Sequence, residues 1–398
     1  MRVSSSTLFD SNVAALNQQQ ARLLQTQQQI ATGRRLSTAA DDPVAATRAL
    51  DLTRSDAINT QYASNRSAAR HTLSITESVL QGVTSLLQDI RTSAISAGNG
   101  TLSMVDRKTV AAEFSGRLEE LIGFANSTDG VGNYLFSGFQ SRTQSFVDTP
   151  AGMGYFGDDG QRLLQVSESR QMSSTNSGAD VFMRVRNGNG TFDTRATSTN
   201  TGSGVVSVGS VANPALLTGD NYSVSFSVVA GVTTYDVTNT TTAAVVSAGN
   251  PYTSGQAIAF DGMQFNISGA PKNGDAFTVV PSANESVFTT ISDLITALNS
   301  SVAGAHLSNS LSRGINNLDH ALDNVLSVRS TLGLRLNEID ALQSAGEDMG
   351  LQLKQSLSQL QDVDYNKAIS DLNQQQINLQ AAQKSFAKVV GLSLFDYI

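Results

Sequence analysis

The sequence contains no cysteine and no tryptophan among its 398 residues. Without cysteine the chain has no disulfides, no thiolate metal sites and no thiol nucleophile. This absence suits a protein that is exported unfolded, because wrong crosslinks cannot form. Histidine is scarce as well, and His71, His306 and His320 lie far apart in sequence. We expect these side chains to be solvated or at the edge of a core rather than metal ligands.

Basic residues are fewer than acidic ones. Lysine and arginine number 26 against 34 acidic residues, which gives a net charge of −8. The few basic residues form no cluster, which argues against nucleic acid and against anionic lipid as partners. No apolar run reaches about 18 residues, so we predict no membrane insertion. The N-terminus lacks the apolar stretch of a Sec-type signal peptide, so secretion would need another route.

Catalytic motifs are missing from the sequence. It has no P-loop, no G-x-S-x-G and no H-E-x-x-H. Residues 152–157 match G-x-G-x-x-G, but the turn residues 158–160 follow where a dinucleotide site needs a helix. The adjacent acids Asp41 and Asp42 are explained by capping and turn roles. We therefore predict that the protein is not an enzyme and has no catalytic residue, cofactor or metal.

The composition changes twice along the chain. Residues 1–140 and 284–398 are rich in Gln, Ala and Leu, whereas residues 141–283 are rich in Gly, Thr, Ser, Val and Asn. Between Arg195 and Asp261 the only charged residues are Asp220 and Asp236. The sequence therefore predicts an α+β multidomain fold: long terminal helices form a coiled coil or bundle, with an antiparallel β-rich domain inserted between them.

The two ends have matching patterns. Both show heptad spacing with glutamine at alternate layers, Gln20 and Gln27 in the first helix and Gln376 and Gln383 in the last. Helices of equal length and pattern at opposite ends favour an antiparallel or bundled pair. Glutamine weakens such a pair, so we hypothesise that neighbouring subunits complete it. The apolar positions of this assembly seam are Phe9, Val13, Leu16, Leu23, Ile30, Ile369, Leu372, Leu379, Phe386 and Val390.

Local signals fix several further elements. Gly33 can end the first helix in the left-handed conformation, and Asp42 with Pro43 can begin a helix that runs to about Ala97. Ser103 and Asp106 form a capping-box pattern for a third helix. In the middle, residues 222–228 alternate apolar and polar, and Asp-Gly at 261–262 predicts a tight hairpin. We expect a compact, sandwich-like antiparallel domain there.

Five segments carry a family resemblance: Met1–Phe9, Ala31–Leu36, Ala40–Ala46, Tyr134–Phe139 and Ser393–Ile398. They resemble the hook-associated protein 3 family, the hook–filament junction proteins of bacterial flagella. The signature residues are Asp41, Asp42, Pro43, Tyr134, Phe136 and Gly138. Flagellin is the nearest alternative because it shares the Ala-Asp-Asp segment, but flagellins tend to have Ala and Gly where Pro43 and Ala46 stand here. A stalk-borne adhesin or enzyme is a further alternative, for which the charge-poor insert offers few groups.

The resemblance implies a structural adaptor at the hook–filament junction, secreted through the flagellar type III apparatus to the extracellular flagellum. It would form a ring-like homo-oligomer between the other hook-associated protein and flagellin, and an export chaperone would hold its C-terminal helix. The implied domains are an inner coiled coil of residues 1–42 and 362–398, a helical bundle of 43–140 and 285–361, and an outer β-rich domain of 141–284.

Overall fold

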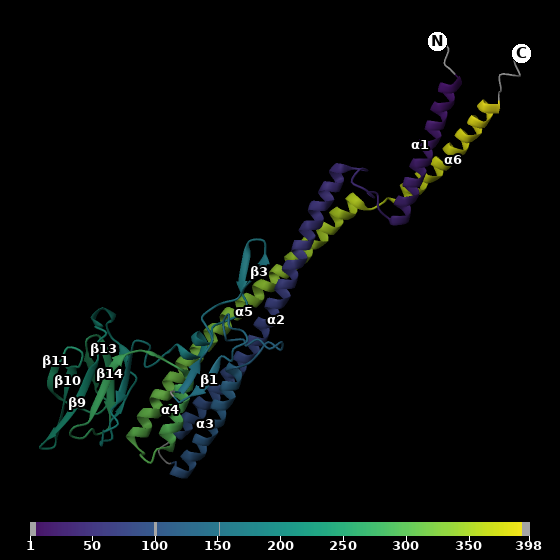
Figure 1. Ribbon diagram of the computed structural model, residues 1–398. Helices are drawn as coiled ribbons and strands as arrows, with labels where there is room; N and C mark the ends of the chain where they lie inside the picture. The colour runs from purple at the N-terminus through teal and green to yellow at the C-terminus, as the bar shows by residue number, and fades with distance from the viewer. Residues whose placement is uncertain (1–4, 99–101, 151, 392–398) are drawn as a thin grey trace, which may run out of the picture. The chain divides into compact units, whose positions relative to one another are not determined.

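The computed structural model describes residues 5–98, 102–150 and 152–391 (Figure 1). The chain divides into two compact units, one of residues 1–64 with 341–398 and one of residues 65–340. Two long helices continue from one unit into the other. The six α-helices of the described residues are α1 (Ser5–Thr32), α2 (Pro43–Ala97), α3 (Met104–Ala125), α4 (Val287–Asn299), α5 (Ala305–Gln361) and α6 (Tyr365–Gly391).

In the first unit α1 packs antiparallel against α6, drawn in purple and yellow in Figure 1. The predicted pairing of the two ends is confirmed. Helix α1 ends at Thr32 because Gly33 takes φ +70°. Helix α6 begins where the Asp364 carboxylate accepts hydrogen bonds from the backbone N–H groups of Asn366 and Lys367.

Two short connections join this pair to the ends of α2 and α5 in the same unit. They are bonded to each other through the backbone: Arg35 N donates to Gln361 O at 2.7 Å, and Val363 N donates to Gly33 O at 3.0 Å. The Arg35 guanidinium also donates to Leu360 O at 2.8 Å. Both turns of the chain are therefore held as one hydrogen-bonded structure.

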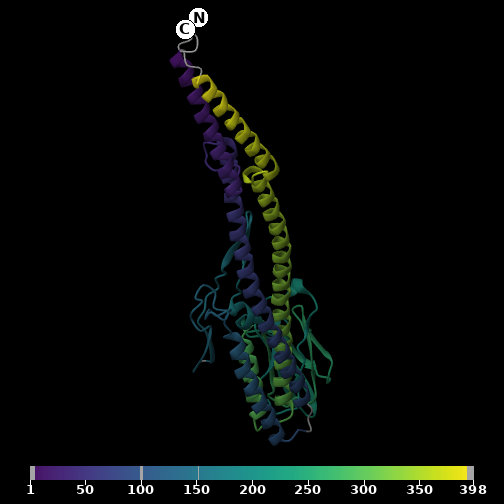
Figure 2. The same ribbon diagram turned by 90° about the vertical axis from the view of Figure 1, so that its right-hand side faces the viewer.

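In the second unit α2 and α5 run side by side (Figures 1 and 2). Ion pairs join them along their length: Arg91 with Asp319, Glu77 with Arg329 at 2.7 Å, and Arg70 with Asp340 at 3.1 Å. Helix α3 begins with the predicted capping box and packs against α4. Among the described residues, no helix is long and apolar enough to span a membrane.

Two hairpins and one irregular helix follow α3 and pack with the helices. Their elements are β1 (Phe146–Thr149) with β2 (Gly152–Tyr155), β3 (Leu163–Ser167) with β4 (Arg170–Ser173), and the π-helix η1 (Ala179–Met183). The aromatic cluster is centred on Phe146, whose ring lies 5.5 Å from Phe182 and 5.2 Å from Phe288 of α4. Phe136 joins the cluster through Phe182 at 5.3 Å. These residues form a buried core between the β1–β2 hairpin, η1 and α4.

The β-sandwich, residues 192–281, contains two antiparallel sheets, as predicted. The larger has the order β11-β10-β9-β14-β6, and the smaller has β12-β13-β7 with β8 beside β13. A two-residue turn, Asp261 with φ 42° and Gly262 with φ 78°, joins β12 to β13 as the Asp-Gly pair predicts. The strands are β6 (Phe192–Ala196), β7 (Val205–Val206), β8 (Ser210–Val211), β9 (Tyr222–Val229), β10 (Val232–Asn239), β11 (Ala244–Pro251), β12 (Ala257–Phe260), β13 (Met263–Ser268) and β14 (Ala276–Pro281), with a 3₁₀ turn η2 (Pro214–Leu216).

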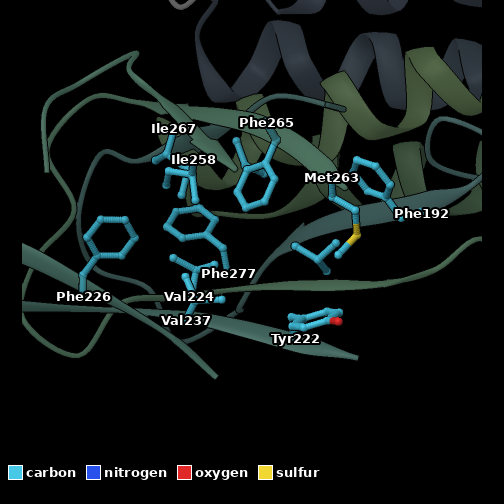
Figure 3. Close-up of a cluster of buried hydrophobic side chains, with 12 residues drawn as sticks. Phe192, Tyr222, Val224, Phe226, Val237, Ile258, Met263, Phe265, Ile267 and Phe277 are labelled. Carbon is cyan, nitrogen blue, oxygen red and sulfur yellow. The ribbon is translucent and has the colours of Figure 1, made fainter. Parts of the chain in front are cut away.

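The core of the sandwich lies between these two sheets (Figure 3). Ile258 and Phe265 of the smaller sheet point toward Val224 and Phe277 of the larger one. The alternation along β9 places Tyr222, Val224 and Phe226 inward, which explains the period-two pattern of the sequence. The short strands β5 (Val185–Arg186) and β15 (Asn284–Glu285) pair where the chain enters and leaves the sandwich.

Candidate assembly interface

The α1–α6 pair has a defined register. The Phe9 and Phe386 rings lie 5.3 Å apart near one end, and Gly33 is bonded to Val363 at the other. Because the helices are antiparallel, seven residues forward along α1 correspond to seven residues back along α6. Starting from Phe9 and Phe386, this register places Leu16 level with Leu379 and Leu23 level with Leu372. The large apolar side chains of the two helices therefore meet in layers spaced by two turns.

Polar or small residues fill the layers between. On α1 these are Gln19 and Thr26, and Thr26 is buried with its hydroxyl donating to Arg22 O at 3.1 Å. On α6 they are Ala368, Gln375 and Ala382. The alternation predicted from sequence is present, but its residues were wrong by one position: Gln20, Gln27, Gln376 and Gln383 are exposed.

Two inward glutamines are incompletely bonded. The Oε1 atoms of Gln19 and Gln375 are buried and find no hydrogen-bond partner among the described residues. A buried acceptor without a partner costs about 1–3 kcal/mol. These layers therefore weaken the isolated pair of helices.

The predicted seam residues occupy two environments. Val13, Leu16, Leu23, Ile30, Leu372, Leu379 and Phe386 are half-buried against the other helix. Phe9 and Ile369 are each 48% exposed, and Ala368, not Ile369, is buried against α1. The side chain of Val390 lies outside the described residues. Sequence reasoning missed Leu24 and Ile377, which are 59% and 64% exposed. The signal that could have identified them is their position outside the heptad seam, where an apolar side chain has no partner in the helix pair.

The Asp-Asp-Pro signature shapes the connection between α1 and α2. The Asp41 carboxylate accepts hydrogen bonds from Ser37 N at 3.0 Å and Thr38 N at 2.8 Å. The backbone N–H of Thr38, then that of Ser37, lowers the pKa of Asp41 below its ordinary value. Asp42 accepts from Ala45 N at 3.0 Å, and Pro43 is the first residue of α2. All three residues therefore act on backbone geometry.

The Tyr-Leu-Phe-Ser-Gly signature belongs to the aromatic core of the second unit. Phe136 is fully buried, and its carbonyl accepts from the Tyr155 hydroxyl at 2.9 Å. Gly138 has φ +69°, and a Cβ there would lie 2.1 Å from Asp158 Oδ1. The Tyr134 backbone N–H donates to Ser141 O at 2.7 Å. This signature is structural in the monomer.

Known proteins resemble both the ends and the middle of the chain. The family model for the bacterial flagellin N-terminal helical region matches residues 3–141, and that for the flagellin C-terminal helical region matches residues 315–398. The model for the D2-like domain of flagellar hook-associated protein 1 matches residues 195–281, nearly the whole β-sandwich. The chain therefore combines flagellin-like ends with a hook-associated type of insert.

Individual relatives are similar over their full length. Flagellar hook-associated protein 3 of Salmonella typhimurium is 29% identical over 401 residues, covering 100% of this chain and 99% of that protein. The crystal structure of hook-associated protein 3 from Legionella pneumophila matches with TM-score 0.74 and 36% identity, covering 78% of this chain and 98% of that one. The chain belongs to the flagellar hook-associated protein 3 family. A flagellin of Listeria monocytogenes, by contrast, is 30% identical over only 32% of this chain.

Membership of the hook-associated protein 3 family makes the chain a structural protein of the extracellular bacterial flagellum, at the hook–filament junction, and not an enzyme. The structure also places the motif and histidines noted in the sequence. The G-x-G-x-x-G residues lie on β2 and the turn after it, with no helix following. His306 and His320 bond to backbone carbonyls. The described residues contain no group of three or more His, Cys, Asp or Glu able to hold a metal ion.

Proposed function

We propose that the α1–α6 pair is a partial interface that neighbouring subunits complete within the junction. The proposal rests on two features of this two-helix pair: half-exposed apolar side chains, and inward glutamines whose Oε1 atoms have no hydrogen-bond partner among the described residues. Phe9, Leu24, Ile369 and Ile377 present apolar surface on a pair that has little core of its own. Exposed apolar surface of this kind is typical of sites where proteins associate.

The proposed assembly is a ring-like homo-oligomer. On its two sides it contacts the other hook-associated protein and flagellin, so that the chain acts as their adaptor. In this proposal residues 1–42 and 362–398 form the inner domain, 43–140 and 285–361 the helical domain, and 141–284 the outer domain. The apolar side chains of α6 also suit capture by an export chaperone before assembly.

A strain that lacks the gene tests the adaptor role. It should build hooks, fail to retain filaments and release flagellin into the medium, as seen by electron microscopy and by immunoblotting of the medium. Complementation with the wild-type gene should restore attached filaments. Filaments anchored normally in the deletion strain would contradict the proposal.

A pair of variants tests the interface itself. Leu379→Asp places a charge in the half-buried layer level with Leu16, and it should block incorporation into the flagellum. Gln380→Asp adds the same charge on the exposed side of α6 and should assemble normally. Both purified monomers should keep the β-sandwich folded. Normal incorporation of Leu379→Asp would refute the assignment of this seam.

A further inference from the structure

The β-sandwich has its own hydrophobic core. All twelve residues of the buried cluster lie between Phe192 and Val279, within the sandwich. The aromatic rings of this cluster are nearly inaccessible, with Phe226 3% and Phe277 1% exposed. The sandwich therefore does not depend on α5 for an apolar core, and its attachment to α5 must be explained by other contacts.

Polar contacts come from one stripe of the first turns of α5. We define the α5 polar stripe as His306, Asn309, Arg313, Asn316, Asn317 and His320. The first three contact the sandwich itself, whereas the last three contact Gly188 and Glu285, where the chain enters and leaves it. Asn309 accepts from Val206 N at 2.9 Å and donates to Gly204 O at 3.0 Å. His306 Nε2 lies 2.6 Å from Asn200 O, and His320 Nε2 lies 2.8 Å from Gly188 O. Because a carbonyl oxygen only accepts, both histidines donate from Nε2.

Arg313 contributes the guanidinium of this stripe, and it bridges three elements. Its guanidinium lies 2.5 Å from a Glu285 oxygen on β15, 3.3 Å from Asp193 on β6 and 3.7 Å from Asp293 on α4. The Asp193 side chain is 2% exposed and also pairs with Arg195 at 2.6 Å. We call these five residues the Arg313 cluster. It joins the first strand of the sandwich to α4 and α5 through ion pairs.

The space around the Arg313 cluster is not closely packed. A cavity of about 480 Å³, lined by residues of β6, α4 and α5, opens beside it. Burial raises the pKa of Asp293, which faces two charged side chains in addition to Arg313: Glu285 on β15 and Arg195 on β6. Glu285 accepts from Asn317 at 2.9 Å and from Thr290 at 3.0 Å. The innermost acids are thus already bonded within the protein, so the cavity is a polar gap in the contact rather than a cation site.

We propose that Arg313 fixes the orientation of the β-sandwich on α5, and that loss of its guanidinium releases the sandwich to move as a folded unit. The contact contains directional hydrogen bonds and ion pairs, which hold one orientation while they are intact. The apolar core lies inside the sandwich, so it stays buried when the two surfaces separate. In this proposal the sandwich has two states, attached and released.

Distances between spin labels test this proposal in the full-length monomer. The chain has no cysteine, so Thr242→Cys in the sandwich and Glu119→Cys on α3 provide two exposed and unique labelling sites. Double electron–electron resonance should give one narrow distance distribution for the wild-type background. Arg313→Met should broaden this distribution, because uncompensated carboxylates then face each other across the contact.

Arg329→Met is the matched control. Arg329 is also on α5 and is 22% exposed, against 26% for Arg313, but it pairs with Glu77 of α2 instead of the sandwich. This variant should keep the narrow distribution. Arg313→Lys retains the charge but loses the planar fork that reaches several carboxylates, so it should give an intermediate width.

Hydrogen exchange of the backbone amides of Val224 and Phe226 reports whether the sandwich stays folded. Their protection should be the same in wild type and in Arg313→Met. A distribution unchanged in Arg313→Met, or equal broadening in Arg329→Met, would overturn the proposal. Loss of sandwich protection in Arg313→Met would overturn the independent fold that the proposal needs. If that variant does not fold at all, an Arg313→Lys distribution identical to wild type would overturn the role of the guanidinium.

Discussion

The α1–α6 pair and the aromatic cluster of the second unit use the same kind of side chain in different ways. Phe9 of the pair is 48% exposed and, among the described residues, contacts one aromatic ring, that of Phe386. Phe146 of the cluster is fully buried and lies within 5.5 Å of three other rings. One region thus completes its packing within the monomer, and the other has apolar surface left over.

This difference follows from what surrounds each region. The aromatic cluster combines rings from the β1–β2 hairpin, η1 and α4, so Phe146 meets partners on several sides. A pair of antiparallel helices has a single line of contact, and here every second layer of that line is polar or small. This contrast supports the proposal that neighbouring subunits stabilise the ends, and it predicts that the body of the second unit is stable alone. Four predictions test this contrast.

The largest effect is expected for Phe146→Ala. Removing a fully buried ring from the aromatic cluster should lower the free energy of unfolding of the second unit by about 3–5 kcal/mol. Phe9→Ala in the helix pair should change the stability of the monomer far less. Chemical denaturation of both variants, followed by hydrogen exchange in each unit, checks this. Equal losses would mean that the pair is as fully packed as the cluster.

Gly138→Ala should have the next largest effect. The glycine has φ +69°, and the new Cβ would meet the Asp158 carboxylate, which accepts hydrogen bonds from Phe139 N and Gly160 N. Gly130→Ala is the control, because Gly130 has φ +83° with open space around it. Backbone strain alone should cost the control about 1–2 kcal/mol, and Gly138→Ala should exceed it. Thermal unfolding of the two variants gives the comparison, and equal losses would remove the steric role of Asp158.

Gln375→Leu should strengthen the α1–α6 pair. It replaces a buried acceptor that has no partner among the described residues with an apolar side chain, for an expected gain of about 1 kcal/mol. Gln376→Leu, on the exposed side, should stay within about 0.5 kcal/mol of wild type. Hydrogen exchange in α1 and α6 measures both. A loss of protection in Gln375→Leu would show that this glutamine stabilises the monomer.

The smallest effect concerns Asp41 at the base of the pair. Hydrogen bonds from the backbone N–H groups of Thr38 and Ser37 lower its pKa from the ordinary 3.8. The carboxylate of Asp41 therefore stabilises the folded connection fully at pH values above 3.8, and this stabilisation is lost as the pH falls through the lowered pKa. Exchange of the Ser37 and Thr38 amides, relative to an unstructured peptide, should rise only in that acid range. Asp41→Asn should abolish this pH dependence, and an unchanged profile would contradict the assigned contacts.

Much of this fold follows from local chemistry. The ends of α1 and the starts of α2 and α3 depend on Gly33, Asp42, Pro43 and Ser103, whose effects act within a few residues. Local chemistry could not determine which glutamine of each neighbouring pair faces the other helix. Gln19 and Gln20 are chemically identical neighbours, and either fits a heptad anchored by Leu16 and Leu23. Only the position of the second helix decides which one is inward.

The sequence pattern does not predict contacts between segments that are distant in the chain. Composition placed residues 141–186 with the insert, yet β1 and η1 of this segment pack with α4 because Phe146 and Phe182 meet Phe288. The break between α4 and α5 was also missed, since residues 284–398 have one helical composition throughout. The Arg313 cluster combines residues from four elements, and no spacing rule links Asp193 to Glu285.

The most direct test is hydrogen exchange of the same protein as a monomer and within isolated hook–filament junctions. In the monomer, the amides of α1 and α6 should exchange much faster than those of the aromatic cluster and the β-sandwich. On assembly, α1 and α6 should become protected while the other two regions change little. If α1 and α6 are already as protected as the β-sandwich in the monomer, the two ends are a finished structure and the proposed interface is wrong.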